Sequence, residues 1–221
     1  MTSASATWFE VRALTLARGH RRLLDGIAFD LAPGDALLVQ GPNGCGKSSL
    51  LRALLGLSLA TGTIRFESES FAVATGKLRN HALYQGHATG LKGELDAVEN
   101  LALAAALDGF ATGEAALRAA LGDAGIAREA TLTTRRLSQG QKQRLVLARL
   151  ALANRQPQTA RPLWLLDEPS SALDTEGAAM LDDLLATHLR KGGAAVIATH
   201  LPMLASAGTN PARPPREMYL G

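Results

Sequence analysis

The sequence predicts a single α/β domain with a mainly parallel sheet, an antiparallel β part and an inserted helical subdomain. Short apolar runs alternate with segments of helical spacing along most of the chain, an order typical of parallel strands joined by helices. Near the start, apolar and polar residues instead alternate as in antiparallel strands exposed on one face. The stretch from Glu94 to Leu121 is rich in Ala and Leu at helical spacing, which indicates the subdomain.

Strands are expected where apolar residues alternate with polar ones or form short buried runs between turn residues. Trp8–Leu16 and Ile27–Leu31 alternate, and the turn Pro33–Asp35 leads into the apolar run Ala36–Gln40. The later expected strands are Thr63–Phe66, His81–Tyr84, Leu163–Leu166, Ala194–Thr199 and an edge strand at Glu217–Leu220. Ligands are expected at the carboxyl ends of the buried strands.

Helical spacing marks the connections between these strands. The expected helices are Ser48–Leu57, Ser138 to about Ala153, and Thr175–Arg190. We place the helical subdomain at about residues 87–153, within one domain that spans residues 1–221. The segment Ala153–Pro162 has no periodic pattern and is interpreted as a surface insertion.

Composition narrows the class of protein. The 221-residue chain has a net charge of +3 and a sequence pI of about 9.3, but its arginines are scattered without interleaved aromatic residues, so we expect no nucleic-acid partner. No apolar run approaches the length of a membrane span, and no secretory signal is visible at the start. Cys45 is the single cysteine, which excludes an internal disulfide and fits a reducing compartment.

The run Gly41-Pro42-Asn43-Gly44-Cys45-Gly46-Lys47-Ser48 fits the pattern of a phosphate-binding loop throughout, between a buried strand and a helix. Its glycines let backbone N–H groups face phosphate oxygens, and the helix start adds positive potential. Lys47 is expected to reach the β- and γ-phosphates, and Ser48 to bind Mg²⁺. The pattern therefore predicts a P-loop NTPase-type fold, in which this run and Ser49 bind the nucleotide.

Asp167 and Glu168 end a second buried strand. Asp167 is expected to hold Mg²⁺ through water, and Glu168 to orient or deprotonate an attacking water molecule. The alternative is a surface acidic pair at the end of a strand. The phosphate-binding loop in the same chain favours the catalytic interpretation.

A second phosphate-seeking helix start is expected at Ser138. Gln141 follows at the spacing of a capping box, and Gly140 leaves a backbone N–H in the first turn accessible. One chain thus carries two such helix starts but only one lysine of the phosphate-binding loop. The simplest arrangement is two chains, each supplying its second helix start to the nucleotide on the other.

The chain resembles ATP-binding cassette (ABC) ATPases over most of its length. The residues that carry the resemblance are Gly41–Ser48, Leu137–Gln141, Leu163–Glu168, Ser171–Asp174 and Thr199–His200. The resemblance implies ATP and Mg²⁺ as cofactors and a head-to-tail dimer with ATP between two copies. It implies that Ser138 and Gly140 contact the γ-phosphate on the partner and that Asp174 crosses the interface. It also implies that His200 senses the γ-phosphate and acts with Glu168 and Lys47 in catalysis.

Two positions depart from the family pattern. Where the family has an adenine-stacking aromatic residue, this chain has Arg18, whose guanidinium either stacks on the base or is merely exposed. Counted back from Glu99–Leu101, the family's glutamine position falls on His87. His87 is therefore expected beside the nucleotide and Mg²⁺, whereas a shifted loop would place Gln85 there.

Further segments resemble the ATP-binding subunit of the bacterial cytochrome c maturation system, a haem exporter: Gly86–Lys92, Asp167–Asp174, His188–Gly193 and Thr199–Pro202. This resemblance implies ATP hydrolysis that serves release of a haem-loaded chaperone, an integral membrane permease subunit as partner, and a peripheral position on the cytoplasmic face of the bacterial inner membrane. Direct haem binding is not expected, because no Cys-x-x-Cys-His sequence occurs. The alternatives are the ATPase of another ABC transporter and an ABC protein that works without a transporter.

Overall fold

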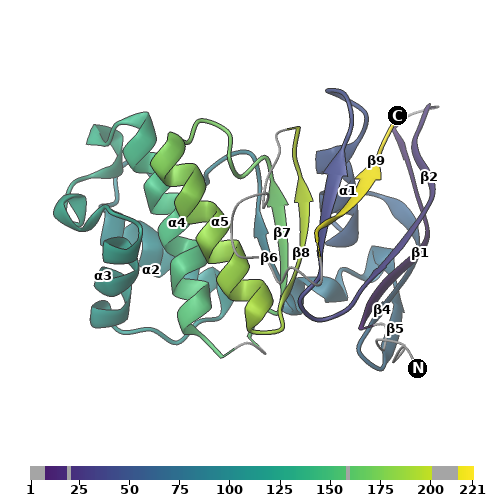
Figure 1. Cartoon of the computed structure of the whole chain (residues 1–221), viewed down its shortest axis with the longest axis horizontal. Helices are drawn as coiled ribbons and strands as arrows, with labels where there is room; N and C mark the ends of the chain where they lie inside the picture. Colours follow the sequence, from purple (N-terminus) through teal and green to yellow (C-terminus); the bar gives the residue numbers. More distant parts are fainter. Residues whose placement is uncertain (1–7, 19–20, 158–159, 201–213) are drawn as a thin grey trace.

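The computed structural model describes residues 8–18, 21–157, 160–200 and 214–221, which form an antiparallel and a parallel sheet with helices around them (Figure 1). The antiparallel sheet has the strand order β2-β1-β4-β5, with β1 Phe9–Arg18, β2 Arg21–Leu31, β4 Ala60–Phe66 and β5 Glu69–Ala72. The parallel sheet has the order β6-β7-β8-β3-β9, with β3 Ala36–Gln40, β6 Ala82–Gln85, β7 Leu163–Asp167, β8 Ala194–Ala198 and β9 Arg216–Tyr219. The expected combination of a parallel sheet with an antiparallel β part is confirmed.

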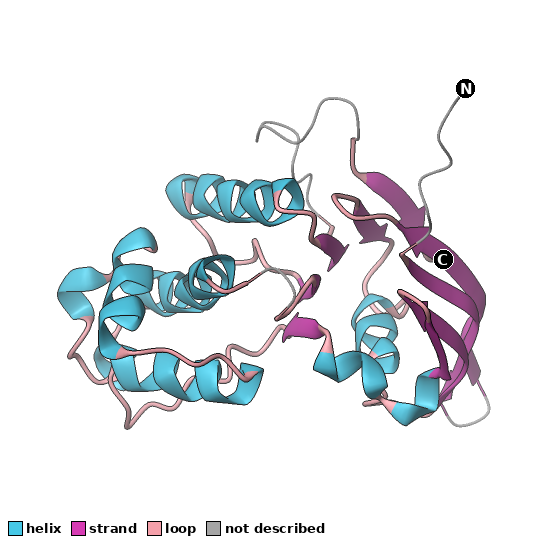
Figure 2. Cartoon of the chain, turned by 90° about the horizontal axis from the view of Figure 1, so that it is seen from below, coloured by secondary structure: helices cyan, strands magenta, loops and turns pink. Residues whose placement is uncertain are grey.

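Helices cover the parallel sheet unequally. Helices α2 (Ala97–Asp108), α3 (Glu114–Asp123), α4 (Gln139–Arg155) and α5 (Thr175–Arg190) gather on one side, while α1 (Lys47–Leu54) lies with the antiparallel sheet on the other (Figure 1). Figure 2 shows the same separation from below, with most helices on the left and most strands on the right. Short 3₁₀ turns occupy Val73–Thr75, Lys77–Asn80, Ala127–Glu129 and Thr134–Arg136. In the described part of the chain, no helix is both long and apolar enough to span a membrane.

The parallel sheet has a hydrophobic core on each face. Successive side chains of a strand point to opposite faces, so a strand that is buried on both faces must be apolar throughout. Trp164 and Leu166 of β7 pack into the core with α2–α5, whereas Leu163 and Leu165 pack with α1 and the antiparallel sheet. All four side chains are buried. This double burial explains the continuous apolar runs of the central strands.

Most predicted elements occur, with shifted ends. Helix α1 begins at Lys47 and ends at Leu54, three residues before the expected Leu57, because Leu55 and Gly56 already form the turn. Strand β5 was not predicted, since Glu69–Ala72 shows too short a pattern to be read alone. The expected insertion after Ala153 is helical as far as Arg155, and residues 158 and 159 lie outside the described part. The subdomain bounds of about 87–153 stay a prediction.

His188 of α5 is a buried histidine away from the expected nucleotide-binding residues. Its ring stacks on Trp164 with a centroid distance of 4.0 Å, and its Nε2 lies 3.2 Å from the carbonyl oxygen of Ala194. Burial lowers the pKa of His188 from 6.5 to about 4, against the opposing effect of the Ala194 and Pro162 carbonyl groups. Between these two pH values the unfolded chain therefore binds more protons than the folded chain.

We expect the free energy of unfolding to fall by about 2 kcal/mol between pH 7 and pH 5 through this histidine. The sign follows because folding lowers the pKa, so the folded state loses stability as the pH drops below 6.5 towards 4. Urea unfolding at both pH values, on the unmodified chain and on His188→Phe, measures the contribution. The phenylalanine variant keeps an aromatic ring on Trp164 and should lose less stability on acidification. An equal loss in both proteins would contradict a neutral buried His188.

Candidate nucleotide-binding site

The phosphate-binding loop joins the carboxyl end of β3 to the start of α1. Gly46 precedes the helix with φ +115°, and Lys47 and Ser48 form its first turn. The buried ammonium group of Lys47 turns back over the loop, where Nζ donates to the carbonyl oxygens of Gly41 (2.8 Å) and Pro42 (3.3 Å). The backbone at the start of α1 and the Lys47 ammonium together offer positive charge to an anion.

The end of β7 places Asp167 beside this loop. Ser48 Oγ donates to Asp167 Oδ1 at 2.8 Å, although the two residues are far apart in sequence. Burial raises the pKa of the Asp167 carboxyl and nearby Glu168 adds to the rise, while the Ser48 hydroxyl and His87 oppose it. A hydroxyl and a buried carboxylate in contact fit Mg²⁺, which takes few protein oxygens and completes its shell with phosphate and water. These two residues would hold the ion.

Glu168 and His200 lie together at the neighbouring strand ends. His200 follows the end of β8, and its Nδ1 lies 2.7 Å from Glu168 Oε2. The Glu168 backbone N–H donates to the Ala198 carbonyl oxygen at 2.8 Å, and its φ of +50° is in the left-handed region. This backbone conformation is energetically unfavourable for a non-glycine residue, and residues strained in this way are concentrated at functional sites. The hydrogen bond to Ala198 fixes the backbone of Glu168, and the contact with His200 fixes its carboxylate.

A hollow of about 420 Å³ opens beside the loop. The side chains that line it come from the phosphate-binding loop, from Glu168 and from the hairpin of β1 and β2: Arg18, Arg21, Leu23, Asn43, Gly44, Gly46, Lys47, Ser48, Ser49 and Glu168. Its volume lies in the range of small-molecule sites in proteins. The structure therefore brings Arg18 to the same space as Lys47 and Ser48, whereas residues 19 and 20 lie outside the described part.

The end of β6 distinguishes His87 from Gln85. His87 lies near enough to Asp167 to oppose the rise in the pKa of its carboxyl, and the His87 side chain is exposed. Gln85 is 5% exposed and turns away towards the helices, where its Oε1 accepts from Arg149 Nη1 at 3.2 Å. Its Nε2 donates to the Gly86 carbonyl oxygen at 3.0 Å. Gln85 is thus held by the helices, while His87 lies on the side of Asp167.

The expected second helix start is a complete capping box. The Gln141 N–H donates to Ser138 Oγ at 3.2 Å, and Gln141 Oε1 accepts from the Ser138 N–H at 2.9 Å. Gln141 is also fixed through Nε2, which donates to Glu129 Oε1 at 3.0 Å. Ser138 and Gly140 are exposed and do not line the hollow beside Lys47. Within one chain, the two helix starts therefore belong to separate surfaces.

Asp174 caps α5 and is tied to α4. Its Oδ1 accepts from the Gly177 N–H at 2.7 Å, and this hydrogen bond lowers the pKa of the Asp174 carboxyl. Arg144 Nη2 donates to Asp174 Oδ2 at 3.5 Å and to Glu176 Oε2 at 2.7 Å. The carboxylate of Asp174 stays exposed on the molecular surface. A second chain can therefore reach this residue without unfolding the helix.

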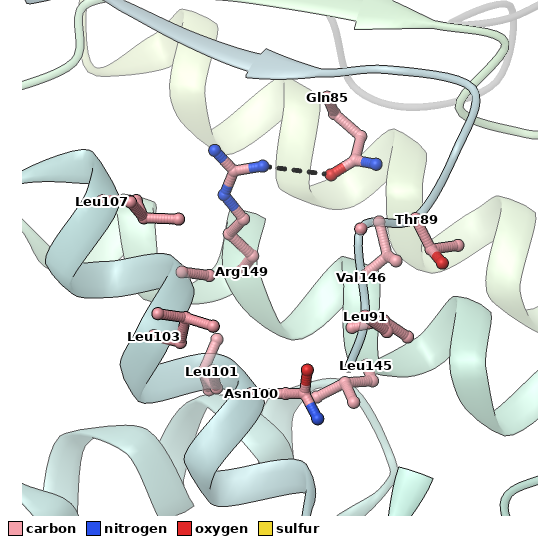
Figure 3. A pocket seen from close by; sticks show the side chains of 12 residues that line it. Gln85, Thr89, Leu91, Asn100, Leu101, Leu103, Leu107, Leu145, Val146 and Arg149 are labelled. Atoms are coloured by element: carbon pink, nitrogen blue, oxygen red, sulfur yellow. Dashed lines mark hydrogen bonds between the residues drawn. The ribbon is translucent and has the colours of Figure 1, made fainter. Parts of the chain in front are cut away.

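An apolar groove lies between the loop after β6 and helices α2 and α4 (Figure 3). Its floor is fixed by Arg149, whose guanidinium forms two 2.7 Å hydrogen bonds with Asp108 and one of 2.9 Å with the Tyr84 carbonyl oxygen. Its rim carries Leu103 and Leu107, which are 38% and 77% exposed. Apolar side chains this exposed at the edge of a hollow are typical of a surface that binds another protein.

A family model described as ABC transporter matches residues 24–171. The chain belongs to the ABC transporter family. It is an ATP-hydrolysing cassette of that family, whose hydrolysis is coupled to transport. The matched range contains the phosphate-binding loop, the capping box of α4 and the acidic end of β7. The predicted family is thereby confirmed.

Curated relatives of this ABC cassette carry the name cytochrome c biogenesis ATP-binding export protein CcmA. The relative from Cupriavidus pinatubonensis is 45% identical over 85% of this chain and 80% of its own length. The relative from Pseudomonas aeruginosa is 41% identical over 86% of this chain and 92% of its own length.

Solved ABC cassettes share the fold. A dimeric ATP-binding cassette in a post-hydrolysis state, bound to ADP and Pi, has a TM-score of 0.75 and 25% identity, over 96% of this chain and 94% of that chain. An ABC transporter ATP-binding protein from Pyrococcus furiosus has a TM-score of 0.76 at 20% identity, over 96% of both chains, and shows the fold alone. Dimers and a membrane partner are general features of such cassettes.

The sequence analysis did not identify three arginines that lie at these sites: Arg21 at the nucleotide hollow, Arg144 beside Asp174 and Arg149 in the groove. Arg149 stands within an apolar stretch of α4, and a largely buried charge must be paired, so its position alone signals a partner. The partner itself, Asp108, could not be found from spacing. Arg21 gave no signal at all, because it lines the hollow only through the β1–β2 hairpin.

Gly41→Ala tests how tightly the loop is packed. A Cβ on Gly41 would lie 2.1 Å from the carbonyl oxygen of Leu220 and 2.9 Å from Cys45 Sγ, at a φ of +140°. We expect a loss of at least about 2 kcal/mol in the free energy of unfolding, from overpacking and backbone strain together. Gly44→Ala is the matched control, because its φ is +82° but nothing lies within 4 Å. Chemical denaturation of both variants decides, and equal losses would contradict the contact with Leu220.

Proposed function

We propose that this chain is the ATP-hydrolysing subunit of a membrane ABC complex that serves haem export and cytochrome c maturation, by releasing a haem-loaded chaperone. The observation that supports this most is the similarity to export proteins of cytochrome c biogenesis over 85% of the chain, with 45% identity. The site geometry adds an intact phosphate-binding loop, a Ser48–Asp167 pair and a Glu168–His200 pair.

Within this function, each strand end has one task. Lys47 and the loop N–H groups bind the β- and γ-phosphates, and Ser48 and Asp167 hold Mg²⁺, which would neutralise phosphate charge when bound. Glu168 takes a proton from the attacking water or orients it, and His200 holds the carboxylate through the contact of 2.7 Å. His87, at the end of β6, reports the state of this site to the loop that borders the groove.

The proposed complex contains two copies of the chain arranged head to tail. Ser138 and Gly140 offer an exposed helix start with accessible N–H groups, and the γ-phosphate on the partner copy would be its anion. Asp174 is exposed near this surface through its link to Arg144 and crosses to the partner. ATP is thereby enclosed between two surfaces that one chain keeps apart.

The groove of Figure 3 is the proposed docking site of the integral membrane permease subunit. An apolar helix segment of that subunit would cover Leu103 and Leu107. Arg149 lines the groove and donates to the carbonyl oxygen of Tyr84 in β6. A displacement of Arg149 by the bound subunit would therefore shift the end of β6 and, with it, His87. The chain accordingly works as a peripheral protein on the cytoplasmic face of the bacterial inner membrane, without binding haem or nucleic acid itself.

Complementation tests the proposed role. A bacterial strain that lacks its own ATP-binding subunit for cytochrome c biogenesis should regain haem-stained c-type cytochromes when this chain is expressed with its native membrane partners. The Glu168→Gln variant serves as the inactive control. Normal ATP hydrolysis by the purified chain together with failure to restore cytochromes would assign it to another transporter.

Leu107→Asp tests the docking site. We expect the variant to lose co-purification with the membrane subunit in detergent while ATP binding stays within about twofold, because the groove is separate from the phosphate-binding loop. Leu59→Asp is the matched control, since Leu59 is 93% exposed but does not line the groove. Loss of the membrane subunit in both variants, or in neither, would reject the groove as the docking surface.

A further inference from the structure

Two arginines that line the nucleotide hollow have side chains without a partner in the described part of the chain. Arg18 and Arg21 are cross-strand neighbours at the end of the β1–β2 hairpin, and both line the hollow. Among the described residues, neither guanidinium group forms a hydrogen bond or an ion pair, whereas the adjacent Arg22 side chain pairs with Asp25 at 2.9 Å. The guanidinium groups of Arg18 and Arg21 are therefore available to a ligand.

The hairpin is packed against the phosphate-binding loop, so the arginines have a set place relative to it. A Cβ on Gly46 would lie 3.0 Å from Leu24 and 3.2 Å from Leu23, both on β2. Arg21 lies two residues before Leu23 on the same strand, and Arg18 faces it on β1. A nucleotide whose phosphates lie on the loop thus places its base at the end of the hollow that these arginines border.

The described side chains at this end of the hollow offer hydrogen-bond donors but no free acceptor. Arginine offers five N–H donors and no acceptor. Among the described lining residues there is no aromatic ring, and the one carboxylate, Glu168, is engaged by His200 near the phosphate end. Guanine presents two acceptors, O6 and N7, on one edge, whereas adenine presents N7 beside an amino donor. Two arginines can therefore donate to both guanine acceptors. At adenine, one of these donors would face the amino group, which is itself a donor, and no hydrogen bond could form there.

We propose that Arg18 and Arg21 form a base-contacting pair that accepts 6-oxopurines, so that this cassette binds GTP and ITP at least as tightly as ATP. The inference rests on the proposed function, because it requires that the loop at Lys47 binds the triphosphate. It names a wider substrate class for the same site, purine nucleoside triphosphates.

Equilibrium binding to the purified full chain tests the proposal. The probes are ATP, GTP, ITP, 7-deaza-GTP and inorganic triphosphate, each with Mg²⁺. We expect GTP and ITP to match or exceed ATP, and 7-deaza-GTP to bind about tenfold more weakly than GTP because it lacks the N7 acceptor. Inorganic triphosphate reports the loop alone.

The double variant Arg18→Lys, Arg21→Lys isolates the guanidinium groups, because lysine keeps the charge but loses the planar donor fork. We expect it to bind GTP about tenfold more weakly, ATP less than about threefold more weakly, and inorganic triphosphate as before. Arg22→Lys is the matched control, and its GTP to ATP ratio should not change.

Three results would overturn the proposal. The first is binding of ATP tenfold or more tighter than GTP by the unmodified chain. The second is an equal loss for every nucleotide in the double variant, which would mean that the arginines contact only ribose or phosphate. The third is binding of no nucleotide and no inorganic triphosphate, and this result alone would overturn the proposed function as well.

Discussion

Glu168→Gln is expected to lower the rate of ATP hydrolysis by at least about 100-fold while ATP binding persists. The substitution removes the group that accepts a proton but keeps the size of the side chain. The backbone at Glu168 is held by the hydrogen bond to Ala198, and His200 fixes the carboxylate at 2.7 Å, so few other groups can take its place. Phosphate release measures turnover, and light scattering with ATP should show a dimer that the unmodified chain forms only transiently.

Glu67→Gln is the matched control for this experiment. Glu67 also has a left-handed backbone, with φ +53°, but lies between β4 and β5 in the antiparallel sheet. Its substitution should leave turnover within about twofold. A Glu168→Gln variant that stays monomeric with ATP and hydrolyses it normally would remove Glu168 from the mechanism.

Lys47→Ala is expected to weaken ATP binding by at least about tenfold, because charge-assisted hydrogen bonds to phosphate contribute roughly 1.5–3 kcal/mol each. Lys47 is 7% exposed, and its ammonium group is held over the loop by the carbonyl groups of Gly41 and Pro42, so it needs little rearrangement to meet a phosphate. Calorimetric titration with ATP, and separately with adenosine, measures the effect. Only the triphosphate should lose affinity.

Lys77→Ala controls for the loss of one positive charge. Lys77 is exposed and pairs with Glu69 on the far strand of the antiparallel sheet. Its removal should leave the dissociation constant of ATP within about twofold, since exposed charges are screened by solvent and salt. If both lysine variants bound ATP as the unmodified chain does, the phosphates would have to lie elsewhere.

The features that could be predicted from the sequence are those whose cause is local. The phosphate-binding loop identifies Lys47 and Ser48 because the pattern, the strand before it and the helix after it are contiguous. The capping box at Ser138 was predicted for the same reason and is confirmed. The catalytic and binding roles assigned to these residues stay predictions.

The remaining features depend on contacts between distant segments. The sequence left open whether Gln85 or His87 faces the nucleotide, and the pairing of Gln85 with Arg149 of α4 could not be foreseen from spacing. No spacing rule brings Asp108 to Arg149, or Leu220 to Gly41. The strand order could not be predicted from spacing either, because β3 pairs with β8 and β9, both more than a hundred residues later.

The late pairing of β3 has a consequence for how the protein is made. On the ribosome, β3 emerges long before the Thr199 N–H that bonds to Val39 and the Leu220 N–H that bonds to Gln40. At about 5–20 residues per second, the nucleotide loop waits on the order of 10 s for its neighbours. A nascent chain therefore has the residues that recognise phosphate long before it has the sheet that holds them in place. ATP binding can therefore stabilise the cassette only after these later strands have formed.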